Sequence, residues 1–121
     1  MGRIAFGVLF REPNFPVVGY ADKELFSALE LSGLALILAR FMPSSGKDIV
    51  QMVDASGEEF WYTRKQCVLS PGFTSKRWTK RQIIDLYNSH VGSDCIYEAR
   101  SLSSKRLLEV VSEVSNLIRS P

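Results

Sequence analysis

Apolar and polar positions alternate along the first part of the chain. Within residues 3–10, one face of an extended segment would carry Ile4, Phe6, Val8 and Phe10. A period of two is that of a β-strand, so we predict a strand here. Pro13 and Pro16 then interrupt regular structure, and the β-rich residues 17–20 resume it. This break followed by a second run predicts a hairpin-like return of the chain.

The next two apolar stretches fit more than one structure. Residues 22–31 favour a short helix that Asp22 caps and Gly33 ends. Their side chains also alternate with a period of two, so a strand is the alternative interpretation. Residues 34–42, LALILARFM, are almost wholly apolar and predict a buried strand that ends at Pro43.

Two further segments have the pattern of strands. Residues 49–54 and 59–63 are rich in β-branched and aromatic side chains and flank the turn-forming sequence ASGE, so they predict a β-hairpin. Residues 95–100, CIYEAR, alternate apolar and charged side chains and predict a short edge strand.

The second half of the chain has the period of helices. Thr79 and Gln82 form a capping box, and Trp78 with Ile83 forms a hydrophobic staple, which together predict a helix over residues 80–90 that Gly92 ends. A last amphipathic helix is predicted over residues 103–119. Its apolar stripe comprises Leu107, Leu108, Val110, Val111, Val114, Leu117 and Ile118.

These elements predict one α+β domain over residues 1–121. We expect an antiparallel sheet or partly closed barrel of about five to six strands, packed by a mid-chain helix (80–90) and a C-terminal amphipathic helix (103–119). A small SH3-like barrel over residues 34–69 with added helices is the alternative.

Composition is consistent with an ordinary globular protein. Hydrophobic residues make up 45% of the chain and charged residues 23%. Cys67 and Cys95 are far apart in apolar stretches, which favours buried free thiols in a reducing compartment. Residues 33–39, GLALILA, are too short to cross a bilayer, and no signal-peptide cleavage site follows the N-terminus. We therefore expect a soluble, cytoplasmic protein.

The sequence shows no catalytic, metal or cofactor motif. His90 is the single histidine, and its place near the end of a helix favours packing or an interaction with the helix dipole over catalysis. The two cysteines and this histidine lack metal-ligand spacing. Glu58 and Glu59 are adjacent in a strand, so they point to opposite faces and cannot flank one substrate bond. We expect no enzyme activity, no metal and no cofactor.

Charge is unevenly distributed. Residues 1–63 have a net charge of −3, from 5 basic and 8 acidic side chains, and residues 64–121 have +5, from 10 basic and 5 acidic. An acid-free basic segment contains Arg64, Lys65, Lys76, Arg77, Lys80 and Arg81. Aromatic side chains within or beside it are Trp61, Tyr62 and Phe73. Such a mixture can hold single-stranded nucleic acid, although a solvated basic face explains it as well.

The functional prediction is a non-catalytic binding or regulatory module that engages a protein partner. Self-association as a homodimer could use the last helix or the edge strand at residues 95–100. The alternative is binding of single-stranded nucleic acid or another polyanion through the basic and aromatic segment at residues 60–81. No membrane partner is expected.

Overall fold

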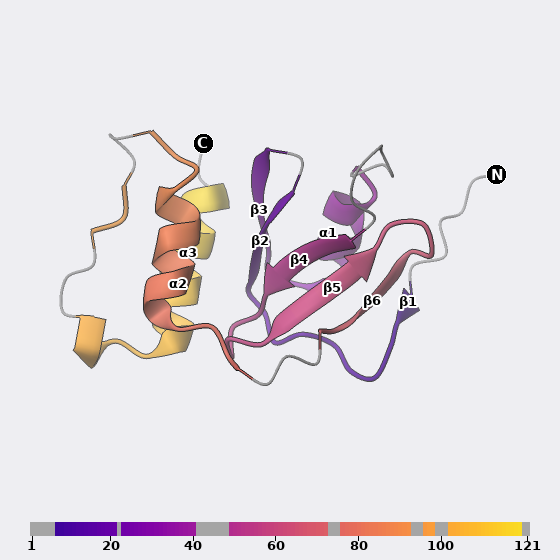
Figure 1. Ribbon diagram of the computed structural model, residues 1–121, viewed down its shortest axis with the longest axis horizontal. Helices are drawn as coiled ribbons and strands as arrows, with labels where there is room; N and C mark the ends of the chain where they lie inside the picture. The colour runs from indigo at the N-terminus through magenta and orange to yellow at the C-terminus, as the bar shows by residue number, and fades with distance from the viewer. Residues whose placement is uncertain are drawn as a thin grey trace.

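The computed structural model describes residues 7–21, 23–40, 49–72, 76–92, 96–98 and 102–119. Its centre is an open sheet of six described strands in the order β1-β6-β5-β4-β2-β3 (Figure 1). They are β1 (Gly7–Val8), β2 (Val17–Ala21), β3 (Glu24–Ala28), β4 (Ile49–Val53), β5 (Glu59–Thr63) and β6 (Val68–Pro71). Neighbouring strands are antiparallel, except that β1 runs parallel to β6. The predicted α+β class is confirmed, and the described sheet is not closed into a barrel.

Helices cover the sheet from both sides. They are α1 (Leu31–Leu38), α2 (Lys80–Asn88) and α3 (Leu107–Arg119), with a short 3-10 helix at Leu102–Ser104. In Figure 1, α1 lies behind the sheet, and α2 and α3 lie together beside β2 and β3. The core on the α1 side includes Val17, Phe26, Leu34, Leu38, Val50, Met52, Phe60, Tyr62 and Leu69. The core under α2 and α3 includes Val18, Val53, Ile83, Ile84, Tyr87, Val110, Val111 and Val114.

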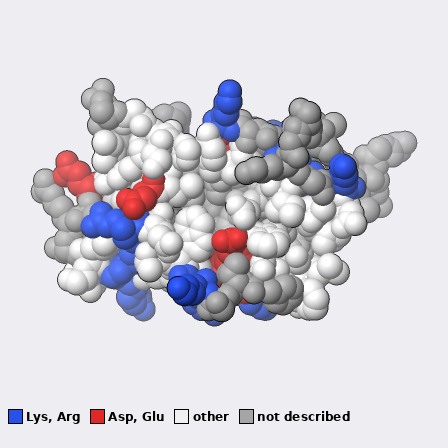
Figure 2. All heavy atoms as spheres, viewed as in Figure 1, with Lys and Arg blue, Asp and Glu red and all other residues white. Residues whose placement is uncertain are grey.

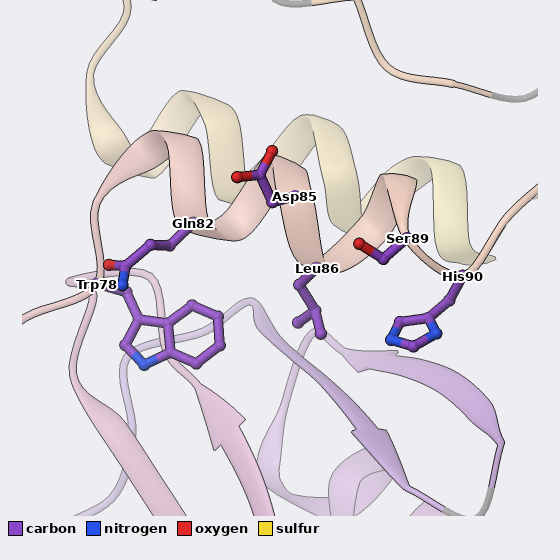
Figure 3. A pocket seen from close by; sticks show the side chains of 6 residues that line it. All are labelled: Trp78, Gln82, Asp85, Leu86, Ser89 and His90. Atoms are coloured by element: carbon purple, nitrogen blue, oxygen red, sulfur yellow. The ribbon is translucent and has the colours of Figure 1, made fainter.

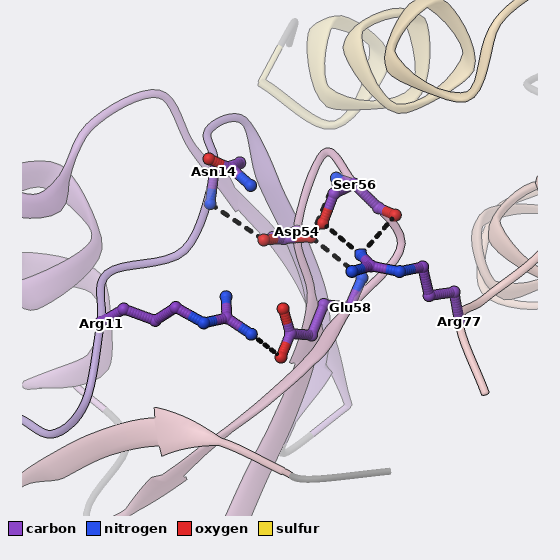
Figure 4. A network of polar contacts seen from close by, with 6 residues as sticks. All are labelled: Arg11, Asn14, Asp54, Ser56, Glu58 and Arg77. Atoms are coloured by element: carbon purple, nitrogen blue, oxygen red, sulfur yellow. Dashed lines mark hydrogen bonds and ion pairs between the residues drawn. The ribbon is translucent and has the colours of Figure 1, made fainter. Parts of the chain in front are cut away.

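The predicted hairpin at residues 49–63 is confirmed as β4 and β5, and its turn is built around Asp54. This carboxylate is fully buried and accepts hydrogen bonds from the backbone N–H groups of Asn14 (2.9 Å), Ser56 (2.9 Å) and Glu58 (3.0 Å). It also accepts one from the Ser56 hydroxyl at 2.7 Å. Figure 4 shows this network, which joins the turn to the segment that precedes β2.

The structures predicted for residues 22–31 and 34–42 are wrong within the described range. Residues 24–28 form β3, which pairs with β2 along its whole length, so the strand alternative holds there. Residues 31–38 form α1, which contains Gly33 instead of ending before it. Leu34 and Leu38 lie four residues apart and share the buried side of this helix. Short apolar runs fit either structure, and packing decided between them. Asp22 and residues 41–43 lie outside the described residues.

Two predicted strand arrangements also differ from the structure. β1 does not return as a hairpin onto β2, because it pairs with β6, and β2 lies between β3 and β4. Residues 96–98 are not a strand. The backbone groups of Tyr97 form hydrogen bonds with the Asn88 side chain instead of with a strand. Asn88 donates to the Tyr97 carbonyl at 3.1 Å and accepts from the Tyr97 N–H at 2.8 Å. Residues 3–6, 95, 99 and 100 lie outside the described residues. The SH3-like barrel is excluded because residues 34–38 are helical and the described sheet is open.

The capping box of α2 is confirmed. Gln82 N–H donates to the Thr79 hydroxyl at 3.2 Å, and Thr79 N–H donates to the Gln82 side chain at 2.8 Å. The helix ends at Asn88, before Gly92 is reached. The last helix, α3, starts at Leu107, four residues later than predicted, because Leu102–Ser104 adopt a 3-10 turn.

A polar cluster holds residues 97–105 against α3. Lys105 Nζ contacts both carboxylate oxygens of Glu113, at 2.8 and 3.1 Å, and the Tyr97 hydroxyl donates to the same carboxylate. The Lys105 ammonium, followed by the Tyr97 hydroxyl, lowers the pKa of Glu113 below its ordinary value.

We expect this cluster to make stability depend on pH. Since the folded pKa of Glu113 is depressed, its stabilisation is complete above the ordinary value of 4.5 and is lost as pH falls through the folded pKa. Glu113→Gln should therefore cost less than about 1 kcal/mol at pH 7, because the pair is partly exposed, and less still at acid pH. Thermal unfolding between pH 7 and pH 3 measures the difference. Glu109→Gln is the control, and a difference independent of pH would contradict the assignment.

Within the described residues, no helix is long and apolar enough to cross a membrane. Cys67 is a free thiol, and Cys95 lies outside the described part.

Candidate binding groove

The face of the sheet that carries α2 is only partly covered by the described helices. In Figure 1, β4, β5 and β6 are turned to the viewer, and α2 stands to one side of them. Figure 2 shows mostly uncharged side chains over the middle of this face, with Lys and Arg at separate points around its rim. Since successive residues of a strand point to opposite faces, Gln51 of β4 and Trp61 of β5 share this side with Val53.

Two adjoining hollows follow the line where α2 meets the sheet. The larger has a volume of about 330 Å³ and the smaller about 170 Å³, and both are lined by Trp78 and Leu86. Together they form what we call the α2 groove. Its lining consists of Gly19, Tyr20, Gln51, Met52, Trp78, Gln82, Asp85, Leu86, Ser89 and His90.

The side of α2 that is not buried in the core forms one wall of this groove. Ile83, Ile84 and Tyr87 are buried, while Gln82, Leu86 and Ser89 recur at helical spacing on another side of the helix. Figure 3 shows the side chains of Trp78, Leu86 and His90 in a row along the sheet-facing side of α2. The wall is therefore largely aromatic and aliphatic.

His90 closes one end of the groove by stacking on Tyr20. The two rings are nearly parallel, with an interplanar angle of 11° and centroids 3.6 Å apart. Tyr20 belongs to β2, so this stack joins the end of α2 to the sheet. His90 thus has a packing role in the structure.

At the other end, Glu59 orients two tryptophans. The Trp78 indole N–H donates to Glu59 Oε1 at 3.1 Å, and the Trp61 indole N–H donates to Oε2. The Gln51 side chain donates to Oε2 at 3.3 Å. Trp61 also lies against Gly72, where a Cβ atom would come within 2.7 Å of its Nε1. One carboxylate on β5 therefore fixes the edges of both indole rings.

The basic residues singled out in the sequence are spread over the molecule. Arg64, which is 6% exposed, and Lys65 follow the end of β5 at Thr63. Arg77 lies at the opposite end of that strand, where it donates to the Ser56 carbonyl (3.1 Å) and hydroxyl (2.8 Å). The length of β5, about 16 Å, separates these groups.

The other cations have different surroundings. Lys80 Nζ donates to the carbonyls of Leu102 (2.6 Å) and Lys105 (2.8 Å), so it ties the 3-10 segment to α2. Lys76 and Arg81 are exposed. The six cations therefore do not all lie on one surface, because Arg64 and Lys65 are at the other end of β5 from Arg77, and nucleic-acid binding by this segment stays a prediction.

The predicted aromatic residues are also divided. Trp61 is half-buried on the α2 side of the sheet, close to Trp78 through Glu59. Tyr62 points into the core on the α1 side, where burial, followed by its hydrogen bond with Cys67, raises the pKa of its hydroxyl. Phe73 lies outside the described residues.

Most residues of the groove were missed from the sequence. The spacing of Leu86 from Gln82 and Ser89 marks a face of α2 separate from the buried one with Ile83 and Tyr87. The period of two places Glu59 and Trp61 on one side of β5, which was a usable signal. Nothing local indicates that Tyr20 meets His90, because the contact depends on how α2 packs on β2.

Within the described chain, no group of three or more His, Cys, Asp or Glu side chains is arranged to hold a metal ion. Comparison of the sequence with protein-family models and with curated proteins, and of the fold with solved structures, finds no significant match.

Proposed function

We propose that this protein is a non-catalytic binding module that holds a segment of a partner protein in the α2 groove. The observation that carries the proposal is the Trp78 indole, which Glu59 holds by a hydrogen bond at one end of a groove that Leu86, Tyr20 and His90 continue. Grooves with fixed aromatic walls are a common way to bind an extended peptide at low entropic cost.

The charges around the groove favour a protein segment over nucleic acid. Asp85 is the single carboxylate among the described lining residues, which include no Lys or Arg, and Glu59 adds a second carboxylate at the end of the groove. A phosphate backbone would be repelled there, whereas nucleic-acid sites gather cations. Arg77 and Lys80 donate to protein oxygens elsewhere.

Selection of peptides from a random display library tests the proposal, with the variant Leu86→Glu as the discriminator. Because Leu86 lines both hollows, a glutamate there should abolish binding of selected peptides that reach a Kd on the order of 10 µM. Leu36→Glu is the matched control, since this leucine is 74% exposed on α1, on the other side of the sheet.

Peptides whose affinity is equal for wild type and Leu86→Glu would place binding outside the groove. Binding of a mixed-sequence single-stranded oligonucleotide that Leu86→Glu abolishes would replace the protein segment by nucleic acid. If no peptide is enriched over a blank support, the proposal fails.

Self-association and a cytoplasmic location belong to the same proposal. Leu108 and Leu117 are exposed on α3, but nine residues place them on opposite sides of the helix, so only one of them at a time would lie in a contact between copies. The free thiol of Cys67 is compatible with a reducing compartment.

A further inference from the structure

The larger hollow of the α2 groove combines an aromatic ring with an uncompensated negative charge. Asp85 lies on the exposed side of α2, and its side chain makes no hydrogen bond or ion pair with any other described residue. Trp78 lines the same hollow. In Figure 3 the Trp78 ring points toward the sheet from the segment before α2, and the Asp85 side chain lies further along, on the side of α2 away from the sheet.

Glu59 adds a second negative charge beside Trp78. Its carboxylate accepts hydrogen bonds from three neutral donors, which are the side chains of Gln51, Trp61 and Trp78. None of the ion pairs among the described residues involves Glu59. The indole N–H thus points at a carboxylate, and the electron-rich faces of the ring are not used by that bond.

The cations nearest in sequence do not neutralise this site. Arg77 donates to Ser56, and Lys80 donates to the carbonyls of Leu102 and Lys105. Arg81 is four residues before Asp85 on α2, and the two exposed side chains form no ion pair in the described structure. No described cation therefore forms an ion pair with Asp85 or Glu59, although Arg81 lies one helical turn from Asp85 and His90 lines the same hollow.

We propose that the partner segment is anchored by a basic side chain, arginine, which stacks on the Trp78 indole and pairs with the Asp85 carboxylate. This inference rests on the proposed function and specifies its ligand. A planar guanidinium can stack on an indole face while its N–H groups meet a carboxylate, and its positive charge strengthens both contacts relative to a neutral planar group. The hollow of about 330 Å³ is large enough for one long side chain.

Titration of the full chain with N-acetyl-argininamide, followed by NMR, tests the anchor. We expect a Kd on the order of 1 mM for so small a probe, with shifts at the Trp78 indole N–H and at the amides of Asp85 and His90. N-acetyl-citrullinamide, which has nearly the same shape without the charge, should bind about tenfold more weakly.

Asp85→Asn is the matching protein variant, and it should leave the fold intact because this side chain has no partner among the described residues. Affinity for N-acetyl-argininamide should fall about threefold to fivefold, and affinity for the citrulline probe should not change. Glu30→Gln, at the start of α1 on the other side of the sheet, removes the same charge and should change neither.

The two levels of the proposal fail differently. Suppose that the display peptides lose binding to Leu86→Glu, contain no basic residue, and bind Asp85→Asn as tightly as wild type. That result would overturn the arginine anchor and leave the groove as the binding site. Equal affinity for the arginine and citrulline probes would overturn the anchor as well. A groove that binds neither display peptides nor the arginine probe would remove both proposals.

Discussion

Replacing Asp54 by alanine is expected to destabilise the protein by about 3–5 kcal/mol, because three backbone N–H groups and one hydroxyl lose their acceptor. The carboxylate is fully buried, and its donors come from both the β4–β5 turn and Asn14. A loss of this size approaches the whole stability of many domains of this size. Urea unfolding followed by circular dichroism measures it.

Asp54→Asn separates the two halves of this network. Oδ1 accepts from Ser56 and Glu58, and Oδ2 accepts from Asn14. An asparagine that keeps its oxygen at the Oδ1 position loses the bond to Asn14 alone, so we expect an intermediate cost of about 1–2 kcal/mol. A loss below about 1 kcal/mol for Asp54→Ala would show that water replaces the carboxylate.

The second large effect is expected at Gly19, where alanine should destabilise the protein by about 2–3 kcal/mol. Gly19 pairs with Phe26 across β2 and β3, and a Cβ atom would lie 2.5 Å from Cζ of the Phe26 ring and 3.0 Å from Cβ of Met52. Both neighbours are almost fully buried, so neither can move away freely. Without this clash, alanine in a strand would be neutral or stabilising.

A double-mutant cycle with Phe26→Leu tests the cause. The leucine removes the ring atoms that the new methyl group would meet, so the double variant should be more stable than the sum of the two single effects predicts. Strict additivity, or a Gly19→Ala variant as stable as wild type, would contradict the steric explanation. Thermal unfolding of the four proteins is sufficient.

Elements with local capping or turn signals could be predicted from the sequence. The capping box at Thr79 and Gln82 places the start of α2, because both hydrogen bonds close within one helical turn. The β4–β5 hairpin follows from two β-rich runs and a short turn, in which Gly57 takes the positive φ of 86° that other residues avoid. These signals depend on neighbours within a few residues, so no knowledge of the fold is needed.

Elements without such signals were decided by tertiary contacts. The apolar runs at residues 24–28 and 31–38 suit a strand or a helix equally, and their structures follow from pairing with β2 and from packing of Leu34 and Leu38 into the core. The pairing of β1 with β6 joins residues about sixty positions apart and has no local signature.

The candidate site shows the same division. The sequence by itself determined that Trp61 and Trp78 stand near a basic segment, and that Glu59 shares a face with Trp61. Three features depend on the tertiary structure alone. Arg64 and Arg77 lie at opposite ends of β5, Tyr62 is buried in the core, and His90 stacks on Tyr20. Proximity along a chain survives folding within one element, but the direction of the next element depends on which faces must be buried together.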